Sequence, residues 1–177
     1  VYNILQSHYA TEYIIKNNFL TEWLIPELNQ NNATVFNEFR VGNSVADLAI
    51  FNGISKVFEI KTEFDSDARL KLQLESYKKI FNEVYLIIPE AKFAAYAKLD
   101  NTVGLISYNT KREQKFTKTR ESQPNFEIDL SAIMNILHTN EYKAILKDHY
   151  GYLPEMTSFT QYEKSKQLIL NIPTLNF

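Results

Sequence analysis

The sequence predicts a mixed α/β fold in which helices flank one sheet, and three observations lead to this class. Apolar residues recur at helical steps near the start, at two-residue steps between residues 35 and 61, and at helical steps again after residue 67. The dipeptides Gly42-Asn43 and Asn52-Gly53 are typical hairpin turns between the strand-like runs. The continuously apolar run at 83–89 is typical of a strand inside a sheet. The expected order, α-β-β-β-α-β-α-β, describes an α/β or α+β layered fold with a mixed sheet.

The first helix is expected over residues 2–28, where Ile15, Phe19 and Trp23 follow one another at four-residue steps. Pro26 is expected to end or kink this helix, because proline lacks the N–H that a helix interior uses. Four polar residues at 29–32 then predict a loop.

Three strands are expected next, over residues 35–41, 44–51 and 55–61, and the tight turns between them predict an antiparallel meander. A helix follows from residue 67, with residues 65–67 (Asp-Ser-Asp) as candidates to cap it. One apolar stripe runs along this helix, formed by Leu70, Leu74, Tyr77 and Phe81.

The remaining core elements are a buried strand at 83–89, an alanine-rich helix at 91–98 and a strand at 103–108. Residues 111–126 are polar and basic and predict a loop, and residues 129–150 predict a C-terminal helix. We therefore expect a core at 1–110, with residues 111–177 forming a basic loop and a helical extension packed on the same domain.

Composition narrows the function classes. The chain has 177 residues, 45% of them hydrophobic and 23% charged, which suits one folded domain and not a disordered chain. The absence of cysteine excludes disulfide scaffolds, thiolate zinc sites and cysteine nucleophiles. No secretory signal pattern and no apolar run of about 18 residues is present, so we expect a cytoplasmic protein without a membrane partner.

The charge is unevenly distributed. The formal net charge is −2, but residues 111–120 hold five basic residues and one acidic residue, a local charge of +4. This segment is either a solvated loop or a contact for a phosphate backbone, with Phe116 available to stack on a base.

Acidic residues interrupt the two apolar strands of the second predicted hairpin. Asp47 lies in one strand, and Glu59 and Lys61 occupy alternate positions, hence one face, of the next. Counting outward from a two-residue turn at Gly42-Asn43 places Glu38 opposite Asp47. Like charges on one sheet face need a cation, and carboxylates are the ligands that Mg²⁺ prefers. Asp47 and Glu59 are the expected ligands of Mg²⁺ or Mn²⁺, with the Ile60 carbonyl as a third, and Lys61 would assist the attacking water.

Asp47, an eleven-residue gap and then Glu59-Ile60-Lys61 resembles the signature of the PD-(D/E)xK nuclease superfamily. This superfamily includes restriction endonucleases, Holliday-junction resolvases and RecB-type exonucleases, and its α-β-β-β-α-β core matches residues 9–89 in order. Gln73-x-x-x-Tyr77 is similar to the QxxxY element of the RecB-like branch. The signature proline is replaced here by Ala46. The resemblance implies a restriction-endonuclease-like core and a Mg²⁺-dependent nuclease acting on nucleic acid, DNA rather than RNA.

The resemblance also implies roles for individual residues. Gln73 would place the scissile phosphate and Tyr77 would contact the substrate, while many members take an additional glutamate from the first helix. Glu22 fits that helix-borne position, whereas the hairpin register favours Glu38, and both remain open. Arg69 is either a phosphate contact or an ordinary exposed helix arginine.

Other interpretations remain beside the nuclease. The acidic residues and lysine could form a solvated hairpin face with incidental ion pairs. The fold could bind nucleic acid without cutting it, or bind a protein through its aromatic-rich C-terminal third. The chain could also be the nuclease domain of a larger toxin.

Overall fold

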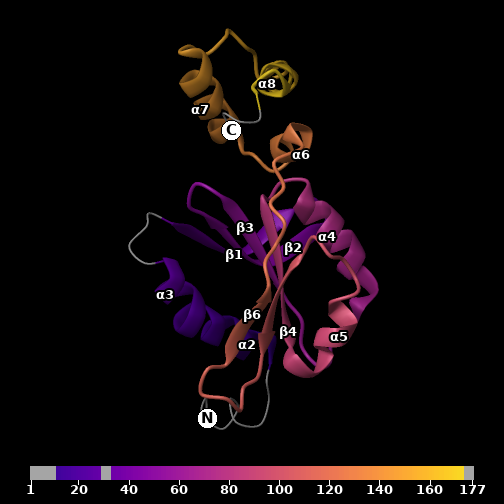
Figure 1. Ribbon diagram of the computed structural model, residues 1–177. Coiled ribbons are helices and arrows are strands. Elements are labelled where there is room, and N and C mark those ends of the chain that lie inside the picture. The colour runs from indigo at the N-terminus through magenta and orange to yellow at the C-terminus, as the bar shows by residue number, and fades with distance from the viewer. Residues whose placement is uncertain (1–10, 29–32, 174–177) are drawn as a thin grey trace.

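The computed structural model describes residues 11–28 and 33–173 of the chain. One six-stranded sheet, in the order β1-β2-β3-β4-β5-β6, forms the centre of the molecule (Figure 1). Helices near the N-terminus lie against one face of the sheet, and α4 and α5 lie against the other. The expectation of a mixed α/β fold with a sheet flanked by helices is thereby confirmed.

The sheet combines antiparallel and parallel pairs. Its strands are β1 Thr34–Val41, β2 Ser44–Phe51, β3 Ser55–Ile60, β4 Glu83–Pro89, β5 Gly104–Tyr108 and β6 Phe116–Arg120. The first three strands pair antiparallel, β3, β4 and β5 pair parallel, and β6 returns antiparallel to β5. The expected meander is confirmed, and its two turns use Gly42 at φ +58° and Gly53 at φ +92°, a backbone region that glycine enters without strain.

Short helices connect and cover the strands. They are α2 Glu12–Asn18, η1 Phe19–Leu24, α3 Ile25–Leu28, η2 Asp67–Arg69, α4 Leu70–Lys78, η3 Glu90–Lys92, α5 Phe93–Tyr96, α6 Leu130–Met134, α7 Thr139–Tyr150 and α8 Gln161–Leu170. The parallel connection from β3 to β4 runs through η2 and α4, and η3 with α5 connects β4 to β5.

Two apolar layers hold the helices on the sheet. Val57, Leu86 and Tyr77 belong to the layer beneath α4. Phe58 and Ile87 belong to the opposite layer, beneath the N-terminal helices. Each fully buried side chain of this size contributes about 1.5–3 kcal/mol relative to exposure. Because β4 lies between both layers, all but its first residue are buried, which confirms the interior strand expected at 83–89.

Pro26 does not end the N-terminal helix, because helical structure continues to Leu28. The six residues before α3 form a π-helix, and the backbone N–H of Ile25 reaches back to the Leu20 carbonyl. Pro26 is the second residue of α3, directly after the π-helix, in helical structure that runs without a break from Glu12 to Leu28. The expected start of this helix at residue 2 lies outside the described residues.

The loop expected at 111–126 is wrong in its middle, since β6 pairs with β5 there. Phe116 is buried against Phe19 and Tyr108, whereas the next three residues are exposed. A short edge strand with charged residues is a common way to close a sheet against further pairing. The expected core boundary at residue 110 therefore falls inside the sheet.

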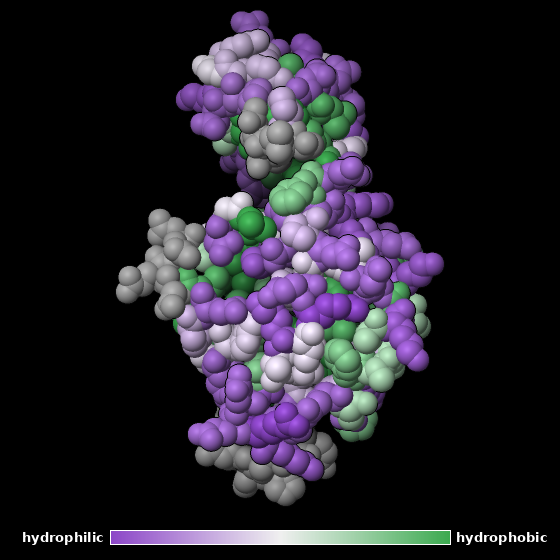
Figure 2. Space-filling view, viewed as in Figure 1, coloured by the Kyte–Doolittle hydropathy of each residue, from purple (hydrophilic) through white to green (hydrophobic). Residues whose placement is uncertain are grey.

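The helix expected at 129–150 is two helices, α6 and α7, and α8 follows them. His138 begins α7 in a capping box, in which its backbone N–H donates to Glu141 Oε2 at 2.6 Å. The three helices share an apolar cluster that includes Met134, Leu146 and Ile169. They form a lobe at one end of the molecule, beyond the sheet (Figures 1 and 2).

Candidate functional site: an acidic cleft at the end of β3

A cleft of about 390 Å³ opens at the C-terminal end of β3, between α2 and the start of α4. Its charged and polar lining consists of Glu12, Lys16, Glu38, Asp47, Glu59, Lys61, Asp65, Ser66, Arg69 and Gln73. The elements that carry these residues are separate in sequence, so the sheet and the two helices together position them.

Glu59 is the most heavily bonded carboxylate in the cleft. It is 4% exposed, and its Oε1 accepts from Lys61 Nζ at 3.0 Å and from Gln73 Nε2 at 2.7 Å. Its Oε2 accepts from the Tyr77 hydroxyl at 2.7 Å. Three donors satisfy a charge that burial alone would disfavour. A carboxylate has about four acceptor positions, so capacity for a cation remains.

Lys61, Gln73 and Tyr77 therefore converge on Glu59. Lys61 Nζ also donates to Gln73 Oε1 at 3.2 Å, so the amide links the lysine to the glutamate. The Tyr77 hydroxyl is 3.0 Å from the Val45 carbonyl as well, and its ring is fully buried. Burial and the neighbouring Glu59 raise the pKa of Tyr77 above its ordinary value, so it stays a donor. Tyr77 is thus both a core residue and part of the cleft's polar network.

The Asp47 side chain bonds to the β3 backbone just beyond the point where backbone pairing between β2 and β3 ends. The last backbone pair is Leu48 with Phe58, and Asp47 Oδ2 accepts a hydrogen bond from the Ile60 N–H at 2.7 Å. Burial, followed by the negative charge of Glu59, raises the pKa of Asp47 from 3.8 to about 7, and Glu12 adds to this effect. The Ile60 N–H acts in the opposite direction. An added cation would relieve both the desolvation and the repulsion at Asp47.

Glu38 lies opposite Asp47, between the pairs Asn37 with Leu48 and Phe39 with Ala46, as the hairpin count predicts. Its φ of +59° is the only positive value among the non-glycine residues that the structure describes. Such a conformation is uncommon for a glutamate and is found more often at functional sites than elsewhere.

Lys16 and Glu12 are residues of the cleft that the sequence pattern does not reveal. The Lys16 ammonium lies 3.8 Å from Asp47 Oδ1 and 3.9 Å from Glu38 Oε1. The one available signal was a lysine that directly follows the apolar pair Ile14-Ile15 in the sequence.

Glu22 does not reach the cleft, because it pairs with Lys115 near β6. Glu12 and Glu22 are ten residues apart, which is about 15 Å along a helix, so only one of them can lie beside Asp47. The helix-borne acid in the cleft is Glu12, and of the two expected candidates only Glu38 lines it.

Arg69 is exposed at the rim of the cleft, one turn before Gln73. Asp65 accepts the Thr62 N–H at 2.6 Å and shapes the loop after β3. The cap of the following helix is Ser66, whose hydroxyl accepts the Ala68 N–H, and not one of the neighbouring aspartates.

Four of the five basic residues in the segment 111–120 make ion pairs or hydrogen bonds within the protein. Lys115 pairs with Glu22 and Arg112 pairs with Glu90. Arg120 donates to three backbone carbonyls, and Phe116 is buried and so unavailable for base stacking.

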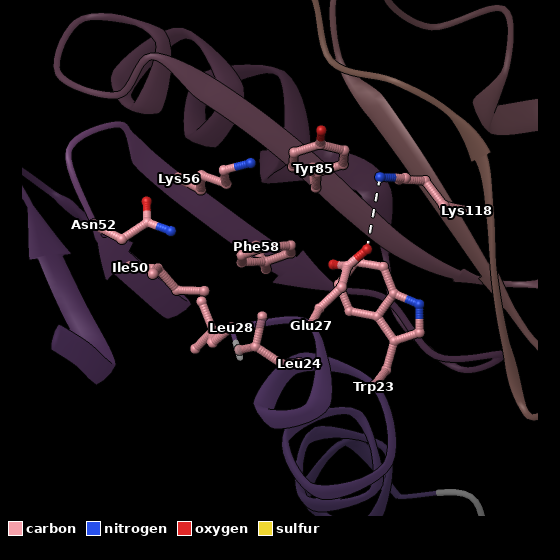
Figure 3. Close-up of a pocket in the computed structure, with 10 residues that line it drawn as sticks. All are labelled: Trp23, Leu24, Glu27, Leu28, Ile50, Asn52, Lys56, Phe58, Tyr85 and Lys118. Carbon is pink, nitrogen blue, oxygen red and sulfur yellow. Dashed lines mark ion pairs between the residues drawn. The ribbon is translucent and has the colours of Figure 1, made fainter. Parts of the chain in front are cut away.

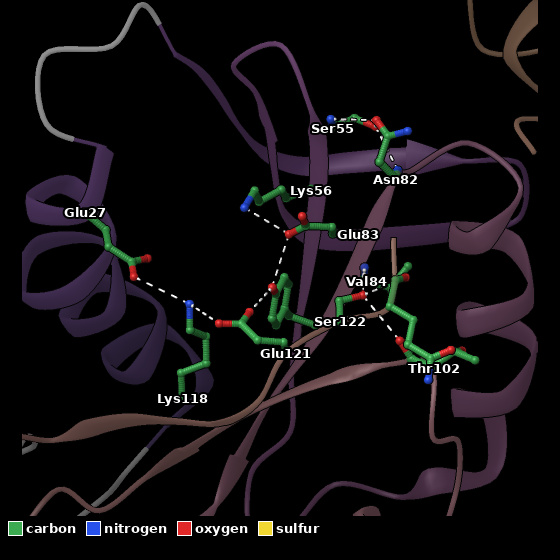
Figure 4. Close-up of polar contacts among 12 residues, drawn as sticks. Glu27, Ser55, Lys56, Asn82, Glu83, Val84, Thr102, Lys118, Glu121 and Ser122 are labelled. Carbon is green, nitrogen blue, oxygen red and sulfur yellow. Dashed lines mark hydrogen bonds and ion pairs between the residues drawn. The ribbon is translucent and has the colours of Figure 1, made fainter. Parts of the chain in front are cut away.

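Lys118 shows the same internal pairing. It lies between Glu27 and Glu121, and Glu121 accepts from the Tyr85 hydroxyl (Figure 4). These contacts border a second cleft of about 260 Å³ on the side of the sheet covered by α3, where Trp23, Leu24 and Phe58 form the walls (Figure 3).

The oxygen ligands of the acidic cleft suit a hard divalent cation that takes only one or two of its ligands from protein carboxylates. Among residues 11–28 and 33–173, no group of three or more His, Cys, Asp or Glu side chains is arranged so that it could hold a metal ion. Mg²⁺ commonly takes one or two carboxylates and completes its shell with water and substrate oxygens. Asp47 and Glu59 fit that requirement, since each retains acceptor capacity on one cleft wall.

Comparison with known proteins assigns the family. Residues 5–174 match the model of the family described as Bacteriophage P4 protein cII. The chain belongs to the bacteriophage P4 cII family. Protein cII of Enterobacteria phage P4 is 30% identical over 136 residues, which are 75% of this chain and 51% of that protein. The cII-family chain thus spans about half the length of this relative.

A solved structure also resembles the cII-family chain, a protein of unknown function, SPO1766, from Silicibacter pomeroyi. The TM-score is 0.45 at 13% identity, over 71% of this chain and 86% of that one. In the part of the chain that the structure describes, every helix is too short or too polar to cross a bilayer.

Proposed function

We propose that this cII-family chain is a metal-dependent nuclease of the PD-(D/E)xK type that hydrolyses phosphodiester bonds in DNA. The observation that carries the proposal is the convergence of Lys61, Gln73 and Tyr77 on Glu59, beside Asp47. A solvated hairpin face would not bury Glu59 and supply it with three donors from two elements.

The order of elements supports the same assignment. From α2 to β4 the chain runs through a helix, a three-strand meander, a helix and a parallel strand, which is the order expected of a restriction-endonuclease-like core. The acidic cleft lies where β2 and β3 diverge, which places Asp47 and Glu59 on adjacent strands.

Each residue has a distinct task in this proposal. Asp47 and Glu59, with the Ile60 carbonyl, would hold Mg²⁺ or Mn²⁺. When bound, the ion would lower the pKa of a water molecule and offset charge on the phosphate. Lys61 keeps an ammonium beside Glu59, where it orients the attacking water and attracts the phosphate.

The helix residues hold and extend this arrangement. Gln73 fixes the separation of Lys61 and Glu59 by bonding to both, and places the scissile phosphate. Tyr77 holds the second oxygen of Glu59 and so orients the carboxylate. Arg69 at the rim has no part in this network and is the group placed to contact a backbone phosphate.

The test is cleavage of supercoiled, linear and single-stranded DNA, and of RNA, by the purified chain with Mg²⁺, Mn²⁺ or EDTA. We expect divalent-ion-dependent cleavage of DNA that Asp47→Ala and Lys61→Ala abolish while circular dichroism stays unchanged. Lys56→Ala is the matched control, because Lys56 lies on β3, the strand that Lys61 directly follows, but pairs with Glu83 away from the cleft (Figure 4). Undiminished cleavage by Lys61→Ala would refute the mechanism.

A second candidate is a protein-binding module of the same fold. An apolar cavity of about 770 Å³ between the sheet and the C-terminal helices favours it, with Phe36, Phe51 and Phe126 exposed along its walls. DNA that stays intact and unbound in every metal condition, together with a stable protein complex lost in Phe126→Ser, would favour this module over the nuclease.

A further inference from the structure

We infer that Lys16 is a built-in cation that replaces a second divalent ion, so that the acidic cleft holds one metal ion and not two. The inference rests on the proposed metal site at Asp47 and Glu59. It concerns Lys16 of α2, which is not part of any of the motifs in the sequence.

The position of the Lys16 ammonium is the first support. Its side chain is 9% exposed, and its Nζ lies between Asp47 Oδ1 at 3.8 Å and Glu38 Oε1 at 3.9 Å. These separations suit ion pairs but are too long for hydrogen bonds. The amine therefore offsets the charge of both carboxylates without using their acceptor positions.

The charge around Lys16 is the second support. Glu12, Glu38, Asp47, Glu59 and Asp65 bring five carboxylates to one cleft, and among them Lys61 is hydrogen-bonded to Glu59 alone. Lys16 is the cation that lies between Asp47 and the 69%-exposed Glu38, whereas Arg69 is exposed at the rim of the cleft. A cation shared by Glu38 and Asp47 would have to occupy the space where this ammonium lies.

The helix keeps Lys16 from moving away easily. Its neighbours Ile15 and Phe19 are 1% and 0% exposed, which anchors this segment on the sheet. A divalent ion entering between Glu38 and Asp47 would meet a nearby fixed positive charge in a partly desolvated cleft. The innermost position, between Asp47 and Glu59, lies beside the Ile60 backbone and Lys61.

The inference distinguishes Lys16 from a lysine that only stabilises the fold. Metal sites that use two ions hold them about 3.5–4 Å apart. A second ion in this cleft would therefore need two carboxylates that it can bind at once. If Lys16 is the replacement, removing its charge frees Glu38 and Asp47 for that ion. A purely structural lysine would change stability but leave the number of bound ions the same.

The experiment counts bound Mn²⁺ per full chain by electron paramagnetic resonance of the free ion, with isothermal titration calorimetry for affinity. We expect one Mn²⁺ in the wild type, two in Lys16→Gln, and one in Lys16→Arg, which keeps the charge. Lys56→Gln serves as the matched control and should bind one ion, because Lys56 pairs with Glu83. Circular dichroism establishes that each variant folds.

The outcomes separate this inference from the proposed function. One ion in both the wild type and Lys16→Gln would overturn the role of Lys16 and leave the metal site standing. No ion in the wild type would remove the metal site, and the inference with it. Two ions in the wild type would overturn the inference whatever the variants do. If Lys16→Gln does not fold, Lys16→Met is a second neutral variant of similar length.

Discussion

Neutralising Asp47 is expected to stabilise the metal-free protein while destroying the proposed metal site. Burial and the charge of Glu59 raise the pKa of Asp47 from 3.8 to about 7. The folded state therefore holds the Asp47 proton more tightly than the unfolded chain does. Asp47→Asn keeps an oxygen that can accept the Ile60 N–H but removes the charge that burial opposes.

The magnitude follows from the pKa difference. The pKa of Asp47 rises by about 3 units, and each unit corresponds to about 1.4 kcal/mol. The free energy of unfolding should therefore differ by about 4 kcal/mol between low pH, where Asp47 is protonated, and high pH, where it is charged. For a raised carboxyl pKa, the stability contribution is complete below the unfolded pKa of 3.8 and is lost as pH rises to about 7. We therefore expect the free energy of unfolding of Asp47→Asn to be about 3 kcal/mol higher than that of the wild type at pH 7. Near pH 3.5 the two proteins should be equally stable.

The assay is urea unfolding of both proteins in EDTA at several pH values from 3.5 to 8. Asp100→Asn is the matched control, and we expect it to change stability in the opposite direction. Hydrogen bonds from Lys78 and Thr102 outweigh burial and lower the pKa of Asp100, so its neutralisation should destabilise the protein at neutral pH. An Asp47→Asn variant less stable than the wild type at pH 7, or a difference that does not change with pH, would refute the electrostatic account of the cleft.

Three further predictions test other contacts. Tyr77→Phe removes the hydroxyl bond to the buried Glu59 carboxylate and should lower the free energy of unfolding by about 1.5–3 kcal/mol, measured in urea; no change would show that Glu59 finds another donor. Gly104→Ala should destabilise by about 1–3 kcal/mol, because a Cβ there would lie 2.3 Å from the buried Tyr85 ring; a Tm equal to wild type would contradict this packing. Saturating Mn²⁺ should raise the Tm of the wild type but not of Asp47→Asn, and equal shifts in both would place the ion elsewhere.

Local periodicity was sufficient to predict the elements that present the cleft. The meander at β1 to β3, the helix α4 and the buried strand β4 each follow from spacing and turn chemistry within a short segment. The alignment of Glu59 with Lys61 also follows, because alternate residues of a strand share a face. Gln73 and Tyr77 likewise share one side of α4, since they are four residues apart on a helix.

Contacts between distant segments decided the remaining features. The strand β6 forms because β5 offers it an edge and Phe116 fits beside Phe19, and neither condition can be seen within residues 111–120. The C-terminal helices divide where His138 caps α7, a local signal that the longer apolar pattern conceals.

Contacts between distant segments also determine which acidic and basic residues line the cleft. The sequence left Glu22 and Glu38 both open. In the structure Glu22, on η1, pairs with Lys115, and Glu12, on α2, lines the cleft instead. In the sequence Lys16 is only a lysine after the apolar pair Ile14-Ile15, and the fold of the sheet places Asp47 and Glu38 beside it. The sequence by itself determined the strands, helices and core of the motif, because these depend on neighbours a few residues apart. The tertiary structure decided which charges meet, because that depends on how separate helices and strands pack.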